Sequence, residues 1–155
     1  MRELVAAVRP GIALRQAGGH DDEVVLHGGG EVFRLPLTED AVARQRALVT
    51  GLPALFAKLP VAVPRPRYVG VLADGQTPFT AERRLPGEPV TELTGIAAAQ
   101  WEGVLAGLDA VTPGEVREWG GLYRPTVLLA DLRRGVLTGL VDWRRIATAT
   151  LTVDP

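Results

Sequence analysis

The chain has 155 residues, of which 46% are hydrophobic and 23% are charged, and its formal net charge is −1 at pH 7. This length suits one domain with one core, and the near-neutral charge excludes a general electrostatic attraction to nucleic acid or anionic lipid. No apolar run approaches the ~18 residues that a membrane-spanning helix needs, and no signal-peptide pattern opens the chain. Cysteine is absent, which excludes disulfides and thiolate metal sites. We therefore expect a cytoplasmic protein that contacts neither membranes nor nucleic acid.

The first elements in the chain are predicted to be strands joined by glycine-rich turns. Gly18-Gly19 predicts one turn, and Gly28-Gly29-Gly30 predicts another between the apolar segments Val24–Leu26 and Val32–Leu35. His20 and His27 flank these turns and are expected to be solvated.

A helix is predicted to follow this hairpin. Thr38 is suited to the N-cap, and Glu39 and Asp40 occupy the first turn, where the helix dipole favours negative charge. Apolar residues recur at helical spacing as far as Phe56, and Gly51-Leu52-Pro53 is expected to break or kink the helix.

The middle of the chain predicts a second hairpin. Tyr68–Leu72 and Pro78–Glu82 are expected to be strands, with Asp74-Gly75 in the turn between them. The following segment RRLPGEPV, residues 83–90, is expected to be a loop.

The last third predicts a helix and a third hairpin. The helix should begin at Thr94, bury one apolar face that includes Trp101, and end at Thr112-Pro113-Gly114. A loop over residues 119–125 should precede strands Val127–Ala130 and Leu137–Val141. Alternating hairpins and helices indicate an α+β fold.

Several residues lie in an order that suits phosphoryl transfer. Such a site needs a glycine-rich turn over the phosphates, a cation on a strand, a hinge for the base and acidic residues for Mg²⁺. Gly18 and Gly19 supply the turn, Arg34 supplies the cation, Glu82 lies in the candidate hinge AERRLPGEPV, and Asp142 ends the last hairpin.

The chain resembles the aminoglycoside phosphotransferase family of kinase-like enzymes. The resemblance extends from about Gly18 to Trp143 through AGGHDDEVVLHGGGEVFRLPL, AVPRPRYVG, RRLPGEPV, LAGLDAVTP and RPTVLLADLRRGVLTGLVDW. It implies a truncated kinase-like fold over residues 1–155. Residues 1–88 should form an antiparallel N-lobe sheet with a helix, and residues 89–155 a reduced C-lobe.

The resemblance is incomplete at the residues that carry the family's chemistry. The family pattern His-Gly-Asp-Leu-His-Pro-x-Asn aligns with residues 119–126, so that Gly121 stands at the catalytic Asp and Thr126 at the metal-binding Asn. Asp142 matches the metal-binding Asp. Gln45 stands where a helix carboxylate would pair with the strand cation, and no residue is assigned as catalytic.

The family also has a helical segment before its catalytic loop, where this chain has only residues 114–118, and it continues into further C-terminal helices. The resemblance therefore implies a missing acceptor pocket. It also implies exposed apolar surface that a homodimer or a protein partner would cover.

Three functions remain open on this reading. The first is a catalytically impaired family member that binds a nucleotide or a small molecule, with ATP and Mg²⁺ held weakly or not at all. The second is an active ATP-dependent O-phosphotransferase of the antibiotic-modifying type. The third is a non-catalytic interaction module or a decayed gene product.

Overall fold

The computed structural model describes residues 1–17 and 21–146. The chain divides into two compact units. Unit 1 comprises Met1–Thr50 and Arg65–Arg84, and unit 2 comprises Gly51–Pro64 and the chain from Leu85 onward. The predicted lobes, residues 1–88 and 89–155, stay a prediction.

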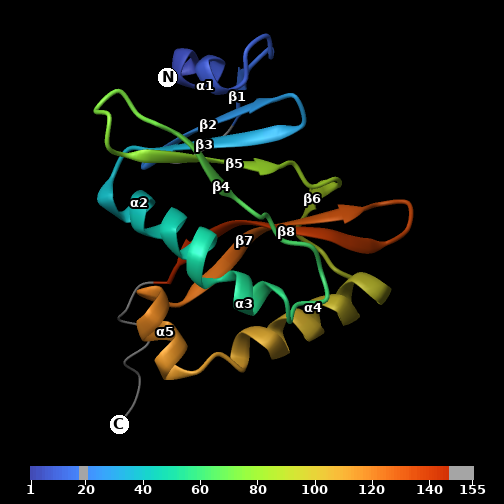
Figure 1. The fold of residues 1–155 in the computed structure, drawn as a ribbon. Helices are drawn as coiled ribbons and strands as arrows, with labels where there is room; N and C mark the ends of the chain where they lie inside the picture. Colours follow the sequence, from blue (N-terminus) through green and yellow to red (C-terminus); the bar gives the residue numbers. More distant parts are fainter. Residues whose placement is uncertain (18–20, 147–155) are drawn as a thin grey trace. The chain divides into compact units, whose positions relative to one another are not determined.

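Unit 1 is built on an antiparallel sheet whose described strands follow the order β1-β2-β3-β5-β4 (Figure 1). β5 pairs with both β3 and β4, so β4 lies at one edge of the described sheet. The strands are β1 (Arg15–Gln16), β2 (Glu23–Gly28), β3 (Glu31–Pro36), β4 (Arg67–Val71) and β5 (Pro78–Arg83).

The predicted first hairpin is confirmed. β2 pairs with β3 from Glu23↔Pro36 to Gly28↔Glu31, and the turn consists of Gly29 and Gly30 with φ angles of 58° and 77°. Two successive left-handed residues are what a tight two-residue hairpin turn requires, and glycine adopts them without steric cost.

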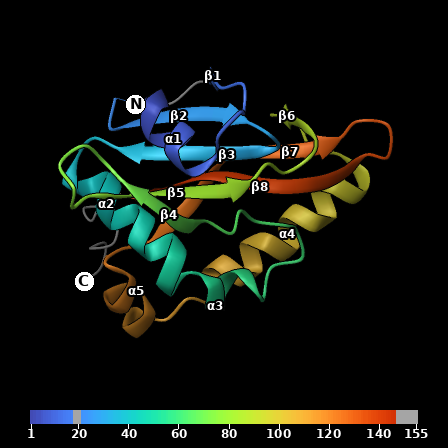
Figure 2. The ribbon, with the colours of Figure 1, turned by 45° about the horizontal axis from the view of Figure 1, so that its top comes forward.

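Two helices cover the two faces of this sheet (Figure 2). The helix α1 (Arg2–Val8), which the sequence analysis did not predict, buries Val5 completely. Val5 belongs to a core cluster with residues that alternate along the strands: Leu26, Phe33, Leu35, Phe79 and Ala81. The opposite face of the sheet therefore presents the intervening residues, many of which are charged.

The helix α2 (Glu39–Arg46) begins as predicted. The Thr38 hydroxyl accepts a hydrogen bond from the Ala41 amide at 3.1 Å, which satisfies one of the free N–H groups of the first turn. A π-helical turn (Ala47–Gly51) and the short helix α3 (Pro53–Phe56) follow, so the predicted break in the helix is also confirmed.

Unit 2 contains a sheet whose described strands are β6 (Glu88–Val90), β7 (Tyr123–Asp131) and β8 (Val136–Arg145). The β7–β8 hairpin is confirmed and is longer than predicted at both ends. The prediction of a loop over residues 83–90 is wrong for Glu88–Val90, which pairs with Leu128–Ala130. Pro89 is tolerated there because β6 is an edge strand.

The helix α4 (Gly95–Asp109) buries Ala97, Val104 and Leu108. Trp101, predicted to be a core residue, is only half-buried. Elsewhere in unit 2, the rings of Phe56 and Trp143 pack with centroids 4.8 Å apart. Both side chains are buried, so Trp143 is a core tryptophan of this unit.

A further helix, α5 (Pro113–Trp119), occupies the segment that was predicted to end α4. The Thr112 hydroxyl accepts a hydrogen bond from the Glu115 amide at 3.2 Å, and the Glu115 carboxylate accepts one from the Thr112 amide at 3.1 Å. This is a capping box with proline at the first helical position. No helix in the described ranges, α4 included, is both long and apolar enough to cross a bilayer.

Candidate functional site

Arg34 lies on β3, on the charged face of the unit 1 sheet. Its Nη1 donates to Oε1 of Glu23 at 2.8 Å, and its Nε donates to Oε1 of Glu82 at 2.9 Å. The Arg34 side chain is 15% exposed, and those of Glu23 and Glu82 are 1% and 5% exposed. The strand cation is thus held between two buried carboxylates.

A second arginine extends this cluster from α2. Arg44 donates from Nη1 to Oδ2 of Asp22 at 2.8 Å and from Nη2 to Oε2 of Glu23 at 3.1 Å. Burial alone would lower the pKa of Arg44, but the hydrogen bond to Asp22 and the charge of Glu23 outweigh it and raise that pKa. Glu23 therefore joins two cations that come from β3 and α2.

Gln45 stands where a helix carboxylate was expected, and it contacts the backbone instead. Its Nε2 donates to the carbonyl oxygen of Arg34 at 2.9 Å. Glu23, which sequence reasoning missed, and Glu82 supply the negative charge to Arg34. The signal for Glu23 was its position on the strand paired with β3. The register pairs Glu23 with Pro36 and Arg34 with Val25, which places Glu23 diagonally beside Arg34 on the same face.

The structure describes only some of the residues of unit 1 that were predicted to bind a nucleotide. Gly18 and Gly19 lie outside the described residues. Glu82 was expected at the end of a strand and within the candidate hinge, and it lies inside β5, where it pairs with Val32 across the sheet. The structure brings Arg34 and Glu82 together, and their role toward a nucleotide stays a prediction.

In unit 2, Asp142 lies in β8 with a φ angle of 58°, and among the described residues it is the only non-glycine with a positive φ. The left-handed conformation costs most L-residues roughly 1–2 kcal/mol, and Asp tolerates it better than most. The hydroxyl of Thr126, opposite Asp142 on β7, donates to the Asp142 carbonyl oxygen at 2.7 Å. Thr126 thus supports an otherwise unfavourable backbone.

The surroundings of the Asp142 carboxylate do not make a protein-only magnesium site. Nη2 of Arg144 lies 3.5 Å from Oδ1 of Asp142, which places a positive charge beside the carboxylate. Over residues 1–17 and 21–146 there is no group of three or more His, Cys, Asp or Glu side chains arranged to hold a metal. Mg²⁺ in proteins takes oxygen ligands in a near-octahedral set, and Asp142 would supply one of them.

Gly121, which the sequence resemblance aligns with a catalytic carboxylate, is buried between α5 and β7. Its amide donates to the Val116 carbonyl at 2.9 Å. A Cβ at this position would lie 2.4 Å from Cδ of Arg145. The side chain of Arg145 therefore occupies the space beside residue 121, and its Nη1 donates to the Gly120 carbonyl at 3.3 Å.

No protein-family model and no curated protein matches the chain. Solved structures do. The GDP and kanamycin complex of APH(2″)-IIIa aligns with a TM-score of 0.71 and 17% identity, over 91% of this chain and 71% of that one. The GDP complex of wild-type aminoglycoside 2′-phosphotransferase-IIIa aligns with a TM-score of 0.62 and 20% identity, over 86% of this chain and 46% of that one.

The chain has the kinase-like fold of the aminoglycoside phosphotransferases. The apoenzyme of macrolide 2′-phosphotransferase MphH from Brachybacterium faecium shares this fold, with a TM-score of 0.56 and 25% identity over 77% of this chain and 46% of that one. The predicted α+β phosphotransferase fold with an antiparallel N-lobe sheet is therefore confirmed. The chain spans 46% to 71% of the length of these three phosphotransferase structures.

Proposed function

We propose that the chain binds a purine nucleotide and transfers phosphate inefficiently or not at all. One observation carries this proposal: Asp142 keeps a left-handed backbone supported by Thr126, whereas Gly121 leaves the catalytic position without a carboxylate. The first feature supports binding, and the second argues against catalysis.

The conformation of Asp142 supports a binding role. Non-glycine residues in the left-handed region cluster at ligand and active sites, because the surrounding structure must hold them there against a cost of roughly 1–3 kcal/mol. Thr126 does so here by donating to the Asp142 carbonyl. A glycine would adopt the same backbone without this cost, so the carboxylate at position 142 is present in spite of its backbone.

The nucleotide itself is inferred from the fold. Two of the similar phosphotransferases are complexes with GDP, so the proposal includes guanine as well as the adenine nucleotide expected from the sequence. Arg34 is proposed to face phosphate, and Glu82 is proposed to orient Arg34 through their 2.9 Å hydrogen bond. Gly18 and Gly19 are proposed to cover the phosphates.

Poor catalysis follows from position 121. Glycine has no group that accepts the proton of an acceptor hydroxyl, and the loss of such a group lowers rates by about 10²–10⁴-fold. Thr126 offers a neutral hydroxyl that is already hydrogen-bonded to Asp142. With one carboxylate in place, Mg²⁺ is proposed to enter only together with the nucleotide phosphates.

Calorimetric titration of the full chain with ATP and with GTP, each with and without Mg²⁺, tests binding. We expect saturable binding that Mg²⁺ strengthens in the native chain and no longer strengthens in Asp142→Ala. Asp109→Ala is the matched control, because Asp109 is an aspartate in the same unit whose side chain is 78% exposed. Absence of heat with both nucleotides at millimolar concentration contradicts the proposal.

A turnover assay separates this proposal from an active phosphotransferase. We expect Mg²⁺-dependent phosphate transfer to kanamycin, the ligand of one similar structure, or to water to be absent or slower by about 10²–10⁴-fold than in an enzyme with a catalytic carboxylate. Transfer without such a loss of rate, which disappears in Asp142→Ala, would instead assign an active enzyme. The homodimer or protein partner stays a prediction, which light scattering of the purified chain checks.

A further inference from the structure

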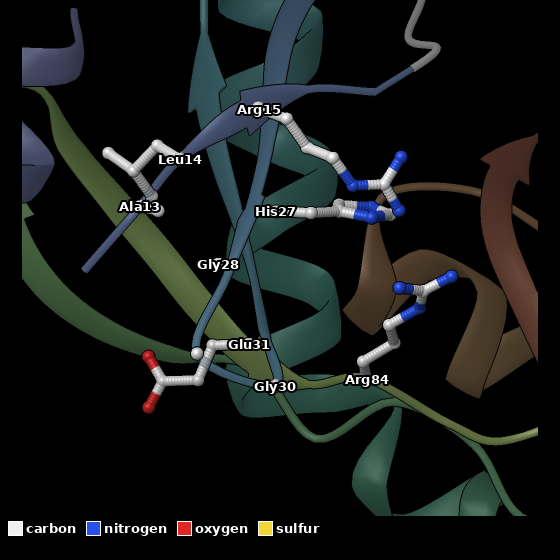
Figure 3. A pocket seen from close by; sticks show the side chains of 9 residues that line it. Ala13, Leu14, Arg15, His27, Gly28, Gly30, Glu31 and Arg84 are labelled. Atoms are coloured by element: carbon white, nitrogen blue, oxygen red, sulfur yellow. The ribbon is translucent and has the colours of Figure 1, made fainter.

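Unit 1 contains a second polar site, whose lining residues include neither Glu23 nor Arg34. It is a cavity of about 330 Å³ that residues of β1, β2, the following glycine turn and the end of β5 line. Figure 3 shows that the side chains of Arg15, His27 and Arg84 direct their nitrogen atoms into one space. In the same view the carboxylate of Glu31 points away from it.

Backbone pairing holds these three side chains in place. Arg15 and His27 are register partners across β1 and β2, and the Arg84 amide donates to the Gly30 carbonyl at 2.9 Å. A Cβ on Gly28 would lie 2.7 Å from the carbonyl oxygen of Ala13. The absence of a side chain at Gly28 therefore lets the chain before β1 pass close to β2 and form one wall of the cavity.

The cavity has an excess of positive charge. Glu31 forms ion pairs with Arg9 at 3.1 Å and with Arg67 at 3.6 Å. Within residues 1–17 and 21–146, neither the Arg15 nor the Arg84 side chain has an ion pair or a hydrogen bond. Arginines that converge without a carboxylate repel one another, and an anionic ligand would relieve that repulsion.

His27 is the third component, and its environment departs from the solvated one that the sequence analysis expected. The side chain is half-buried, and its Nδ1 is buried without a hydrogen-bond partner in the described structure. Burial, followed by the charges of Arg84, Arg15 and Arg34, lowers the pKa of His27 below its ordinary value. A buried polar atom without a partner is uncommon in folded proteins and marks a place where a ligand or ordered water would bind.

We propose that this cavity binds the oxyanion group of a small molecule, a phosphate or a carboxylate, through Arg15, Arg84 and His27. Each guanidinium presents a planar set of N–H donors that matches two oxygens of such a group, and the imidazole adds a third donor. The cavity volume leaves room for the rest of a small ligand beside the charged group. The site uses neither Asp142 nor any other residue of unit 2, so it does not depend on the proposed nucleotide function.

The proposal has a consequence for pH. Burial, and after it the charges of Arg84 after β5, Arg15 on β1 and Arg34 on β3, lower the pKa of His27 and so disfavour the charged imidazole. A bound oxyanion favours the charged imidazole and raises the pKa of His27. Linkage then requires that the oxyanion bind more tightly as the pH falls through the interval between the free and the bound pKa of His27.

NMR titration of the full chain tests the site. The chain has two histidines, His20 and His27, so a His20→Gln variant leaves one imidazole signal to follow. We expect inorganic phosphate or succinate to shift the His27 resonances to saturation and to raise the pKa of His27. The phosphate and succinate titrations distinguish the two oxyanions. No rise in that pKa with either anion, or an equal rise with chloride at matched ionic strength, would overturn the proposal.

The affinities of single-residue variants for the anion show where it binds. Arg15→Ala and Arg84→Ala should each weaken binding by roughly tenfold, the value of a charge-assisted hydrogen bond. Arg133→Ala, which changes an exposed arginine in the β7–β8 turn, should leave the affinity unchanged. Unchanged affinity in the double variant Arg15→Ala/Arg84→Ala would also overturn the proposal.

Melting temperatures show whether a variant loses affinity because it misfolds or because it lacks an anion-binding side chain. Arg15 and Arg84 are exposed, and without the anion their removal relieves repulsion. We therefore expect the double variant to melt at the same or a higher temperature than the native chain in the absence of phosphate, and to gain less from added phosphate. A lower melting temperature without phosphate, with the gain from phosphate intact, would assign these arginines a structural role and contradict the proposal.

Discussion

The cluster around Glu23 in unit 1 and the turn at Asp142 in unit 2 position charged groups in two different ways. In unit 1, Arg34 and Arg44 are held by carboxylates, with four hydrogen-bonded contacts between 2.8 and 3.1 Å. In unit 2, Asp142 is held by its backbone, which takes a left-handed conformation supported by one hydroxyl.

This difference teaches which of the two arrangements has a structural role. Opposite charges that are buried together must remain paired, because an isolated buried charge is strongly unfavourable. A strained backbone has the opposite effect, since it lowers stability and persists where the side chain has another use. Substitutions in the first region should therefore destabilise the fold, and at residue 142 a glycine should leave the fold more stable than an alanine does.

The largest effect is expected for Glu23→Gln. This change leaves Arg34 and Arg44 with one fewer negative charge between them, and breaking a buried pair costs about 3 kcal/mol or more. The measurement is the free energy of unfolding from urea denaturation followed by circular dichroism. Glu92→Gln, at an exposed loop position, is the control and should be neutral. A loss no greater than that of the control would mean that the cluster adds nothing to stability.

The second effect concerns residue 142. Asp142→Gly and Asp142→Ala both remove the contact with Arg144 at 3.5 Å, but only alanine retains a Cβ in the left-handed region. We expect the free energy of unfolding of the glycine variant to exceed that of the alanine variant by about 1 kcal/mol. Equal stabilities would show that the backbone at residue 142 relaxes, and would remove strain as an argument for function.

The smallest effect is expected for Thr112→Ala, which removes the cap of α5. The loss of an N-cap threonine costs about 1 kcal/mol. Thr94→Ala is the matched control, because Thr94 is also an N-cap residue but its side chain makes no cap hydrogen bond. Thermal denaturation measures the stability of both variants. An equal loss of stability in Thr94→Ala would show that the hydrogen bonds of the capping box do not stabilise the fold.

The same pair of residues predicts a pH dependence. The backbone and side-chain hydrogen bonds from Thr112 lower the pKa of Glu115 below its ordinary value of 4.5. The stabilisation from a lowered carboxylate pKa is present above that value and is lost as the pH falls through the folded-state pKa. The difference in stability between the native chain and Thr112→Ala should therefore shrink below about pH 4.5. A difference that is constant down to acid unfolding would contradict this assignment.

Local elements were largely predictable from the sequence. Gly29 and Gly30 indicated the hairpin turn, and Thr38 indicated the start of α2, because both depend on preferences of residues close in sequence. The helix α5 was also predictable in principle, since Thr112-Pro113-Gly114-Glu115 has the capping-box spacing. Its proline and glycine were interpreted as the end of a helix, although proline is common at the first helical position.

The candidate sites were predictable only in part. Arg34 was identified as the strand cation, but its partners Glu23 and Glu82 lie 11 and 48 residues away in sequence. The cavity with Arg15, His27 and Arg84 was not predicted, because His27 was expected to be solvated. The pairing of β1 with β2 and the path of the chain after β5 bring these residues together.

The sequence by itself determined the turns, the helix caps and the absence of a carboxylate at position 121, since each depends on the chemistry of one residue and its immediate neighbours. The tertiary structure decided which charges meet. Antiparallel register places Thr126 beside Asp142 and Glu23 beside Arg34, and register depends on the packing of a whole sheet face rather than on any local preference.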